Sequence, residues 1–529
     1  MNSRYDVIVV GAGHNGLVTA AYLAKAGRSV LVVERSETAG GMIGGEQIAP
    51  GFTAPLAFPS AERLHPAVVK ELHLQAHGLQ MLVPAGITIV GAGGPLRFDG
   101  RGRIAAGNGN GAPSPADREA LAELERLVGR IAAALEPLYG KPLPELEELG
   151  AADTIDLLKV GWRLRRLGRR DMREAMRLLP MSIRDVAEER LESPALRAAL
   201  AGLGVEGAWL GPFSAGTAFN LVHHRIGAAG AMLAGPSFVA GSMGVLAAAL
   251  EGAARAAGAE VRTGAEVIRI DAGPGGARGV TLANGGHVEC ETVVSDADPR
   301  RTLLGLVDPG LLEPEFLAAV ANIRARGGVA VVSFALDGLP GFDFQGRIQL
   351  GGGVHDIERA FDAAQDGRLP DRPLVQLTIP SLLDNRVVPE GGHVATAWVQ
   401  TVPRHLRSAA NGDQEGWRQG REALADAVVA VIEEALPGFG DRVRARRVLA
   451  PPDLEERFAA SGGCLYDVDV CLDQALFLRP LPGWCRHRTP IDGLYLCGSG
   501  THGGGGVSGL AGRNAAAQVL ADLRGRSAG

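Results

Sequence analysis

The stretch YDVIVVGAGHNGLVTAAYLAKAGRSVLVVER, residues 5–35, contains two short apolar runs separated by glycines and a longer periodic segment. The β-branched residues of 7–10 predict a buried strand, and a helical pattern follows over 14–26. Gly27 is expected to end this helix, and residues 29–33 predict a second strand. The stretch therefore predicts one β–α–β unit, which is the building block of parallel sheets.

Three glycines link the first strand to the helix in the pattern G-x-G-x-x-G, at Gly11, Gly13 and Gly16. The first permits a tight turn, the second lets the backbone approach a pyrophosphate, and the third lets helix and strand pack closely. The free N–H groups and the dipole at the start of the helix attract phosphate. Glu34 ends the second strand, where a carboxylate accepts hydrogen bonds from ribose hydroxyls. We therefore predict a dinucleotide site, which also includes His14, Asn15 and Arg35; an ordinary β–α–β unit with packing glycines is the alternative.

The size and composition of the chain limit the classes to which it can belong. At 529 residues it is too long for one ordinary hydrophobic core, which predicts at least two structural units. A net charge of −6 gives no reason to expect a nucleic-acid partner. Five cysteines, an odd number without C-x-x-C spacing, indicate a reducing compartment, so we expect a cytoplasmic protein. No feature of the sequence indicates an oligomeric state.

The adjacent histidines His223 and His224 suggest a metal site. Neighbouring side chains, however, point to opposite faces of a strand and diverge by about 100° on a helix, so both cannot easily reach one ion. Further ligands at suitable spacing are missing from the sequence around them. We therefore expect no metal.

Two segments bear on contact with a membrane. Residues 226–250 form the longest uncharged run, but glycines and Pro236 interrupt it, which favours two elements joined by a turn over a membrane-spanning helix. Residues 159–177 carry eight basic side chains, interleaved with Trp162 and leucines. This pattern has two interpretations: a peripheral contact with an anionic membrane surface, or the solvated face of a surface helix, which the composition favours.

The tract GSGTHGGGGVSGLAG, residues 498–512, repeats the strand–glycine–helix arrangement near the end of the chain. Residues 494–497 predict a strand, and 508–523 predict a helix. No second strand or acidic residue follows this helix, so the tract does not form a nucleotide site of its own. The apolar patterns on both sides exclude a flexible tail. We expect the tract to close on the cofactor bound by the first motif.

Several stretches carry a resemblance to known flavoproteins. The first motif with its later glycine pairs at 40–41 and 44–45 resembles the FAD signature of amine-oxidase-like and phytoene-desaturase-like enzymes. GPFSAGTAFNLVHH (211–224), SDADPRRTLLGLVDP (295–309) and RTPIDGLYLCGSGTHGGGGVSGLAGRNAA (488–516) resemble phytoene desaturase, carotenoid isomerase and retinol saturase-like flavoproteins. Within these the chain most resembles the branch called pyridine nucleotide-disulfide oxidoreductase domain-containing protein 2. The resemblance extends over nearly the whole chain.

The resemblance implies an α/β fold with a discontinuous FAD domain of the two-dinucleotide-binding, Rossmann-like type and an inserted α+β substrate domain. We expect the FAD domain to comprise 1–75, 236–300 and 456–529, and the substrate domain 76–235 and 301–455. FAD is the implied cofactor. Its implied contacts, beyond the first motif, are Gly40, Gly41, Met42, Val267, Gly498, Ser499, Gly505, Gly506 and Val507.

The activity implied by the resemblance is hydride transfer between a C–H of an apolar substrate, a polyene, isoprenoid or lipid-like molecule, and flavin N5, which forms or rearranges C=C bonds. His502 and Asp467 are acid/base candidates. Candidates to line the substrate pocket are Phe52, Phe58, Trp209 and Phe213. A non-catalytic flavin-binding protein that acts through partners is an alternative. Amine oxidation is disfavoured, because such enzymes usually place a lysine beside flavin N5 and no lysine follows Lys159.

Overall fold

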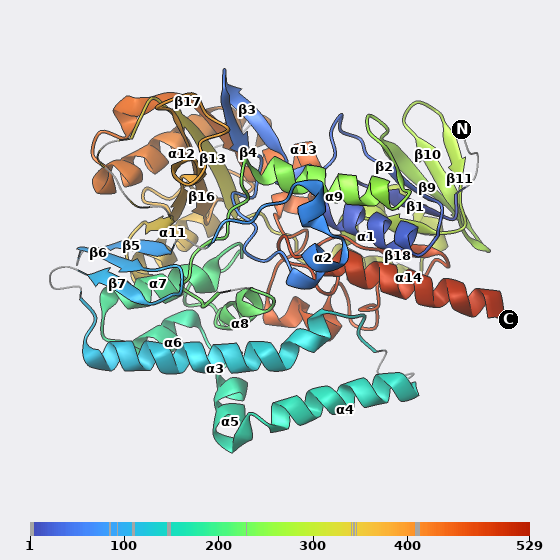
Figure 1. Ribbon diagram of the computed structural model, residues 1–529, viewed down its shortest axis with the longest axis horizontal. Coiled ribbons are helices and arrows are strands. Elements are labelled where there is room, and N and C mark those ends of the chain that lie inside the picture. The colour runs from blue at the N-terminus through green and yellow to red at the C-terminus, as the bar shows by residue number, and fades with distance from the viewer. Residues whose placement is uncertain are drawn as a thin grey trace.

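Five parallel strands form a sheet close to both chain ends, in the order β18–β12–β1–β2–β8 (Figure 1). The computed structural model describes residues 5–528, apart from 84–85, 92–93, 108–111, 145–149, 229, 340, 342–343, 345 and 408–412. The strands come from three distant parts of the chain: β1 (Val7–Val10), β2 (Val30–Val33), β8 (Glu260–Arg262), β12 (Val293–Ser295) and β18 (Leu494–Leu496).

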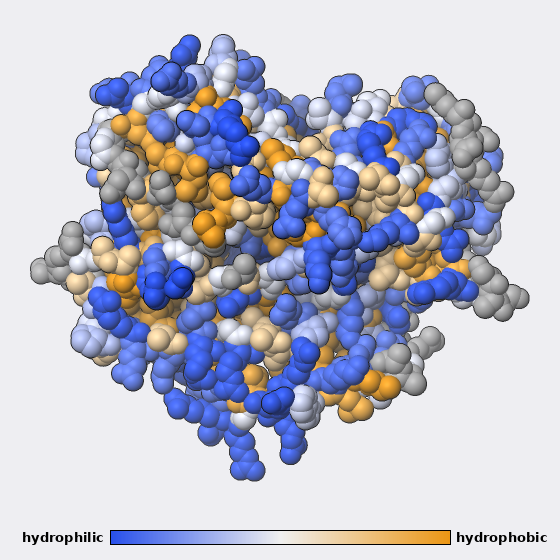
Figure 2. All heavy atoms as spheres, viewed as in Figure 1, coloured by the Kyte–Doolittle hydropathy of each residue, from blue (hydrophilic) through white to orange (hydrophobic). Residues whose placement is uncertain are grey.

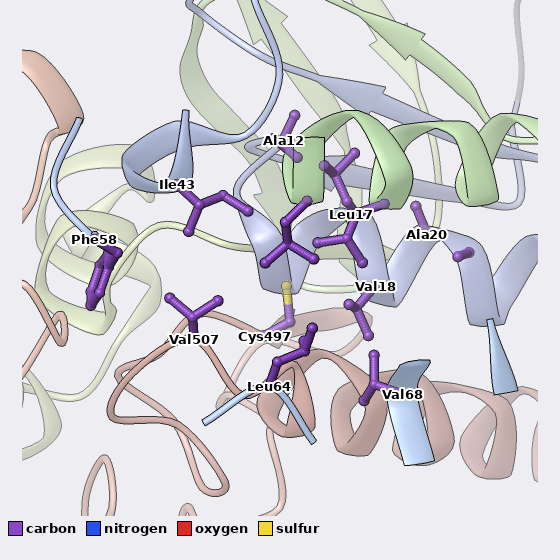
Figure 3. Packing of buried hydrophobic residues seen from close by; sticks show 14 of the residues in the cluster. Ala12, Leu17, Val18, Ala20, Ile43, Phe58, Leu64, Val68, Cys497 and Val507 are labelled. Atoms are coloured by element: carbon purple, nitrogen blue, oxygen red, sulfur yellow. The ribbon is translucent and has the colours of Figure 1, made fainter. Parts of the chain in front are cut away.

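Helix α1 (His14–Lys25) joins β1 to β2, as the opening stretch predicts. Helix α14 (Leu510–Ala528) packs beside α1, where the Thr19 hydroxyl donates to the Gly512 carbonyl at 3.0 Å. Helix α9 (Met243–Ala256) precedes β8 and also packs against α1. Leu17 and Val18 of α1 share one buried apolar cluster with Cys497 and Val507 from the end of the chain (Figure 3).

A three-stranded antiparallel sheet leads back to this parallel sheet. It consists of β9 (Val267–Gly273), β10 (Gly276–Leu282) and β11 (His287–Glu289), and β12 follows directly. Its apolar side chains, together with those on one face of β1 and β2, form a second buried cluster.

The second large sheet has eight strands, in the order β17–β13–β16–β15–β14–β5–β6–β7, and lies on the opposite side of the molecule from both termini (Figure 1). Strands β13 and β16 pair over their whole length and are almost completely buried. The strands are β5 (Ile87–Gly91), β6 (Gly94–Phe98), β7 (Ile104–Gly107), β13 (Val329–Leu336), β14 (Arg347–Leu350), β15 (Val375–Thr378), β16 (His393–Gln400) and β17 (Val443–Leu449).

Helices cover this sheet, and most begin at a side-chain cap or a proline. Helix α3 begins with a capping box, in which the Ser114 hydroxyl accepts from the Asp117 N–H at 3.0 Å. The helices not yet given are α2 (Pro66–Glu71), α3 (Pro115–Tyr139), α4 (Ala151–Arg165), α5 (Gly168–Leu178), α6 (Ile183–Arg190), α7 (Pro194–Val205), α8 (Phe219–Arg225), α10 (Pro314–Ala321), α11 (Val354–Gln365), α12 (Asp413–Ala435) and α13 (Pro451–Phe458).

The predicted fold class is confirmed: a parallel α/β sheet built from distant segments carries a separate, mixed second domain. The hairpin of β3 (Gly45–Ala49) and β4 (Phe52–Pro55) leaves the first sheet and packs against β13 and β16 of the second. The exact domain boundaries stay predictions. The uncharged run 226–250 divides between an irregular segment and α9. In the described part of the chain, no helix has both the length and the apolar character needed to cross a bilayer.

We expect Gly512→Ala to destabilise the fold, because a Cβ there would lie 2.3 Å from the Asn15 carbonyl oxygen of α1. Overpacking of this kind lowers the free energy of unfolding by about 1–3 kcal/mol. On the same helix, the Cβ of Gly525→Ala would lie in open space. The better helix propensity of alanine should therefore raise the free energy of unfolding by about 0.5–1 kcal/mol. Chemical denaturation of both apoproteins measures the difference, and equal effects would contradict close packing of α14 on α1.

Candidate active site

A cleft of about 1020 Å³, counting its part open to solvent, lies where β1, β2 and β12 end. This is the edge of a parallel sheet where ligands bind in open α/β folds. Many of the residues predicted to bind the cofactor line it: Gly11, Gly13, His14, Asn15, Glu34, Arg35, Gly40, Gly41, Met42, Val267 and Ser499. Among the described residues, the structure thus brings the first motif, the glycine pair and the strand of Val267 to one place.

The G-x-G-x-x-G segment has the geometry that its glycines predict. Gly11 has φ of +97°, which disfavours other residues. A Cβ at Gly16 would lie 2.3 Å from the Gly11 carbonyl oxygen, so helix and strand touch closely. Gly13 is the N-cap of α1 without any side-chain cap, and a Cβ there would lie 2.4 Å from Asp296 Oδ2. The first turn of α1 therefore opens on a space bounded by bare backbone, which fits a diphosphate.

Glu34 lies at the end of β2 and is buried. Its Oε2 accepts from the Ala12 N–H at 2.7 Å, and its Oε1 accepts from the Ser36 N–H at 2.9 Å. The carboxylate thus holds the turn after β1 while it lines the cleft. Arg35 donates to the Glu456 carbonyl at 3.0 Å and closes the rim against the end of α13.

The first motif and the late glycine tract meet through polar contacts. Asn15 Nδ2 donates to Ser499 Oγ at 3.2 Å, and the Gly512 N–H donates to Asn15 Oδ1 at 3.3 Å. Burial lowers the pKa of His14 to about 4, although a hydrogen bond to the Gly506 backbone opposes this shift. His14 is therefore neutral, and its buried Nε2 has no hydrogen-bond partner among the described residues.

The rest of the late glycine tract, residues 498–512, lies behind the cleft or beside a second hollow next to Phe58. Gly505 has φ of +90°, and its carbonyl accepts from the Arg63 guanidinium and faces His223 Nε2 at 3.2 Å. Gly506 and Val507 line the second hollow, which also contains Phe58. A Cβ at Gly498 would lie 2.6 Å from the Asp296 carbonyl oxygen. Contact of Gly498, Gly505, Gly506 and Val507 with FAD stays a prediction.

Asp296 is the most consequential residue of the cleft that sequence reasoning missed. It directly follows β12, and its carboxyl faces Gly13 and Gly16 of the first motif. Burial, with the nearby charge of Asp467, raises the pKa of the Asp296 carboxyl well above its usual range, and the N–H groups of Gly16 and Gly13 oppose the rise only in part. A neutral carboxyl suits this position, since a carboxylate beside a diphosphate would repel it. The position of Asp296 directly after a buried parallel strand is the feature that could have identified it as a residue of the cleft.

The two acid/base candidates lie in different surroundings. Asp467 lines the cleft and accepts from the Gly500 N–H at 3.0 Å. Burial, with the charge of Asp298, raises its pKa to about 7, a value suited to proton transfer. His502 is fully buried behind the tract, where its Nε2 lies 2.8 Å from the Leu138 carbonyl. His502 lines neither hollow, and its acid/base role stays a prediction.

Of the four aromatic candidates, only Phe58 reaches the site, and it lines both the cleft and the second hollow. Phe52 is fully buried between β4 and the second sheet. Trp209 packs edge-on against Phe361 beside a separate hollow. Phe213 is 37% exposed and lies under the Arg184 guanidinium. The aromatic character of a residue alone therefore does not predict whether its side chain lines a pocket, packs in the core or lies on the surface.

The second hollow has aromatic and charged walls, whereas the sequence predicts an apolar pocket. Phe58 lies edge-on to Trp398 with ring centroids 5.4 Å apart, and stacks near Tyr466 at 6.2 Å. Arg347 on β14 forms ion pairs with Glu62 and Glu206, both at 2.8 Å. These residues come from separate segments of the chain, so no local sequence pattern predicts that they lie together.

His223 and His224 are neighbours on α8, with ring planes inclined at 70° to each other. His223 Nε2 lies 2.6 Å from the Arg63 guanidinium, and its Nδ1 lies 3.2 Å from the Tyr139 hydroxyl. In the described ranges, no group of three His, Cys, Asp or Glu side chains could hold a metal ion. The five cysteines, all in described segments, are buried free thiols.

The parallel sheet, the bare start of α1 and the adjoining cleft define a protein of the dinucleotide-binding type. The sequence pattern of the family described as flavin containing amine oxidoreductase matches residues 16–520. The chain therefore belongs to this family, FAD is its cofactor, and its class is that of flavin-dependent oxidoreductases.

Individual relatives confirm the resemblance stated from the sequence. A pyridine nucleotide-disulfide oxidoreductase domain-containing protein 2 from Mus musculus is 34% identical over 559 residues, with 99% of this chain and 94% of that protein covered. A phytoene desaturase (neurosporene-forming) from Cereibacter sphaeroides is 28% identical over 296 residues, with 55% and 54% covered. The structure of putrescine oxidase bound to putrescine has a TM-score of 0.63 at 16% identity and 99% coverage of both chains, which shows a shared fold.

We expect Gly13→Ala to weaken FAD binding about tenfold or more while the apoprotein stays folded. The new Cβ meets only the movable end of the Asp296 side chain, and φ of −68° at Gly13 suits alanine. Gly16→Ala is the matched comparison, because its Cβ meets the Gly11 backbone and should lower apoprotein stability as well. FAD fluorescence titration and apoprotein melting measure the two effects. Unchanged FAD affinity in Gly13→Ala would contradict the diphosphate site.

We also expect FAD affinity to fall as pH rises through the raised pKa of Asp296. Below this pKa the carboxyl is neutral; above it the carboxylate repels the diphosphate, and one such group lowers affinity by about tenfold per pH unit at most. Asp296→Asn should reduce this slope and bind FAD more tightly than the wild type above the raised pKa of Asp296, and the part of the slope that arises from Asp467 should remain. FAD titrations from acidic to alkaline pH test this, and parallel curves for both proteins would show that the pH dependence arises from other groups.

Proposed function

We propose that this protein is an FAD-dependent oxidoreductase that removes hydride from a C–H bond of an apolar polyene, isoprenoid or lipid-like substrate and forms or rearranges C=C bonds. Bound FAD supplies the hydride acceptor, flavin N5. The supporting observation is that Phe58 lines both the cofactor cleft and the aromatic hollow beside it. A molecule in that hollow would lie next to the cofactor.

The aromatic walls suit a hydrocarbon. Phe58, Trp398 and Tyr466 offer ring faces and edges, and Trp398 is held by donation from its Nε1 to the Ala57 carbonyl at 2.6 Å. Burial strongly raises the pKa of the Tyr466 hydroxyl, so this group stays protonated. Rigid aromatic surfaces can position an extended apolar chain with little loss of entropy.

The charged residues indicate that the substrate is not a pure hydrocarbon along its whole length. Arg347 is neutralised by its two carboxylate partners, whereas Arg63 is bonded to carbonyl groups and to the neutral ring of His223. Arg63 is buried, and its Nε has no partner among the described residues. We propose that a polar end of the substrate accepts a hydrogen bond here.

Proton handling is the second requirement of the proposed reaction. Asp467, with its pKa near 7, is the acid/base candidate that lines the cleft. A polyene substrate delocalises developing positive charge, so a strong base is not needed. The absence of any lysine after Lys159 in the sequence disfavours amine oxidation as the alternative.

Anaerobic mixing of the FAD-loaded protein with candidate substrates tests the proposal. We expect a polyene or long-chain lipid that carries a polar end, such as retinol, to bleach the visible flavin absorbance, and putrescine to leave it unchanged. Trp398→Leu should slow bleaching about tenfold or more with FAD content unchanged, because it removes a wall of the hollow. Trp209→Leu is the matched control beside a different hollow and should have no effect.

If none of the polyenes and lipids tested reduces the flavin, the proposed reaction is wrong and a non-catalytic binding role is favoured. Faster reduction by amines than by any apolar compound would instead favour amine oxidation. Equal slowing by both tryptophan variants would show that the effect arises from stability and not from the hollow.

A further inference from the structure

Helices α4 and α5, residues 150–178, form an arm that lies below α3 at the margin of the molecule (Figure 1). The inner side of this arm is packed: Val160 and Leu178 are buried in one cluster with apolar residues of α3. Leu164 packs against the same cluster. The arm therefore has a defined inner face and a defined outer face.

The outer face of α4 is apolar and exposed. Ile155, Leu158 and Trp162 have 52%, 67% and 57% of their surface accessible. Their spacing of three and four residues places them on one side of the helix. Figure 2 shows orange side chains among blue ones over this part of the molecule. Exposed apolar side chains gathered on one helix face indicate an interaction surface.

All acidic side chains of the arm are paired, whereas several of its basic side chains are not. The arm has eight basic and four acidic side chains, although the whole chain has a net charge of −6. Each of the four acidic side chains forms an ion pair with a basic residue outside the arm. These pairs are Asp153–Arg486 at 3.7 Å, Asp156–Lys141 at 2.5 Å, Asp171–Arg126 at 2.9 Å and Glu174–Arg190 at 2.8 Å.

Three of the arm's basic side chains form ion pairs: Lys159 with Asp156, Arg170 with Glu123 and Arg177 with Glu189. Arg163, Arg165 and Arg169 form no ion pair or side-chain hydrogen bond with any described residue. The Arg166 guanidinium lies over the Trp162 ring, 4.5 Å from its centroid, next to the apolar face. The outer surface of the arm is thus apolar along one line and positively charged beside it.

We propose that this arm binds the surface of an anionic membrane, with Ile155, Leu158 and Trp162 at the level of the headgroups and the arginines against anionic lipid. An amphipathic helix of this composition lies in the plane of the interface, and each basic residue adds attraction to anionic lipid. A second copy of the chain fits less well, because a symmetric contact would place two positively charged faces against each other. The inference is independent of the proposed reaction.

Sedimentation of the FAD-loaded protein with lipid vesicles tests the inference. We expect binding to vesicles of phosphatidylcholine with phosphatidylglycerol, little binding to phosphatidylcholine alone, and release by salt. Ile155→Ser/Leu158→Ser/Trp162→Ser should lower the partition coefficient about tenfold or more. Arg163→Gln/Arg165→Gln/Arg169→Gln should lower it to a similar extent and reduce its salt dependence.

Matched controls are available elsewhere on the surface. Val83→Ser/Ile268→Ser removes two exposed apolar side chains outside the arm, and Arg101→Gln removes a basic one, so neither should change binding. FAD content and melting temperature check that each variant is folded. Absence of vesicle binding by the wild type, or equal losses in arm and control variants, would overturn the inference. A wild-type dimer that the arm variants convert to monomers would also overturn it, in favour of a second copy.

Discussion

The packing of the last helix against the first is the contact on which the rest of the site depends. Asn15 and Thr19 on α1 bond to Ser499 and Gly512, and glycine at 512 lets the two helices approach to backbone distance. This contact places the late glycine tract beside the phosphate turn and sets β18 at the edge of the parallel sheet. The same tract lines part of the cleft through Ser499 and part of the second hollow through Gly506 and Val507, and its Gly500 N–H donates to Asp467.

A second constraint on the site is the electrostatic potential at the edge of the sheet where the parallel strands have their carboxyl-terminal ends. Glu34, Asp296 and Asp467 line one cleft that also receives a diphosphate, which is itself an anion. The start of α1 contributes positive potential. The carboxylate of Glu34 is held by two N–H groups, and burial favours the neutral form of Asp296. The site can bind an anion because its acidic residues are either bonded to N–H groups or protonated.

Much of the first domain was predictable because its signals are local. The β1–α1–β2 unit, the Ser114 cap and the strand–glycine–helix end of the chain follow from spacing within short stretches. The resemblance supplied the discontinuity of the FAD domain. The pairing of β14 with β5 and the ion pairs of Arg347 join segments far apart in sequence, so no periodicity predicts them. His502 and Phe213 line neither the cleft nor the second hollow, and only the tertiary structure determines this placement.

The position of β18 also bears on how the chain reaches its native state. During synthesis β12 emerges long before β18, so its outer edge stays unpaired until β18 is made. An unpaired apolar strand edge is a template for association with other chains. Contacts between such distant segments also form slowly, because loop closure precedes any gain in free energy. The arrangement that completes the cofactor site thus leaves the edge of β12 open to association with other chains until β18 has been synthesised.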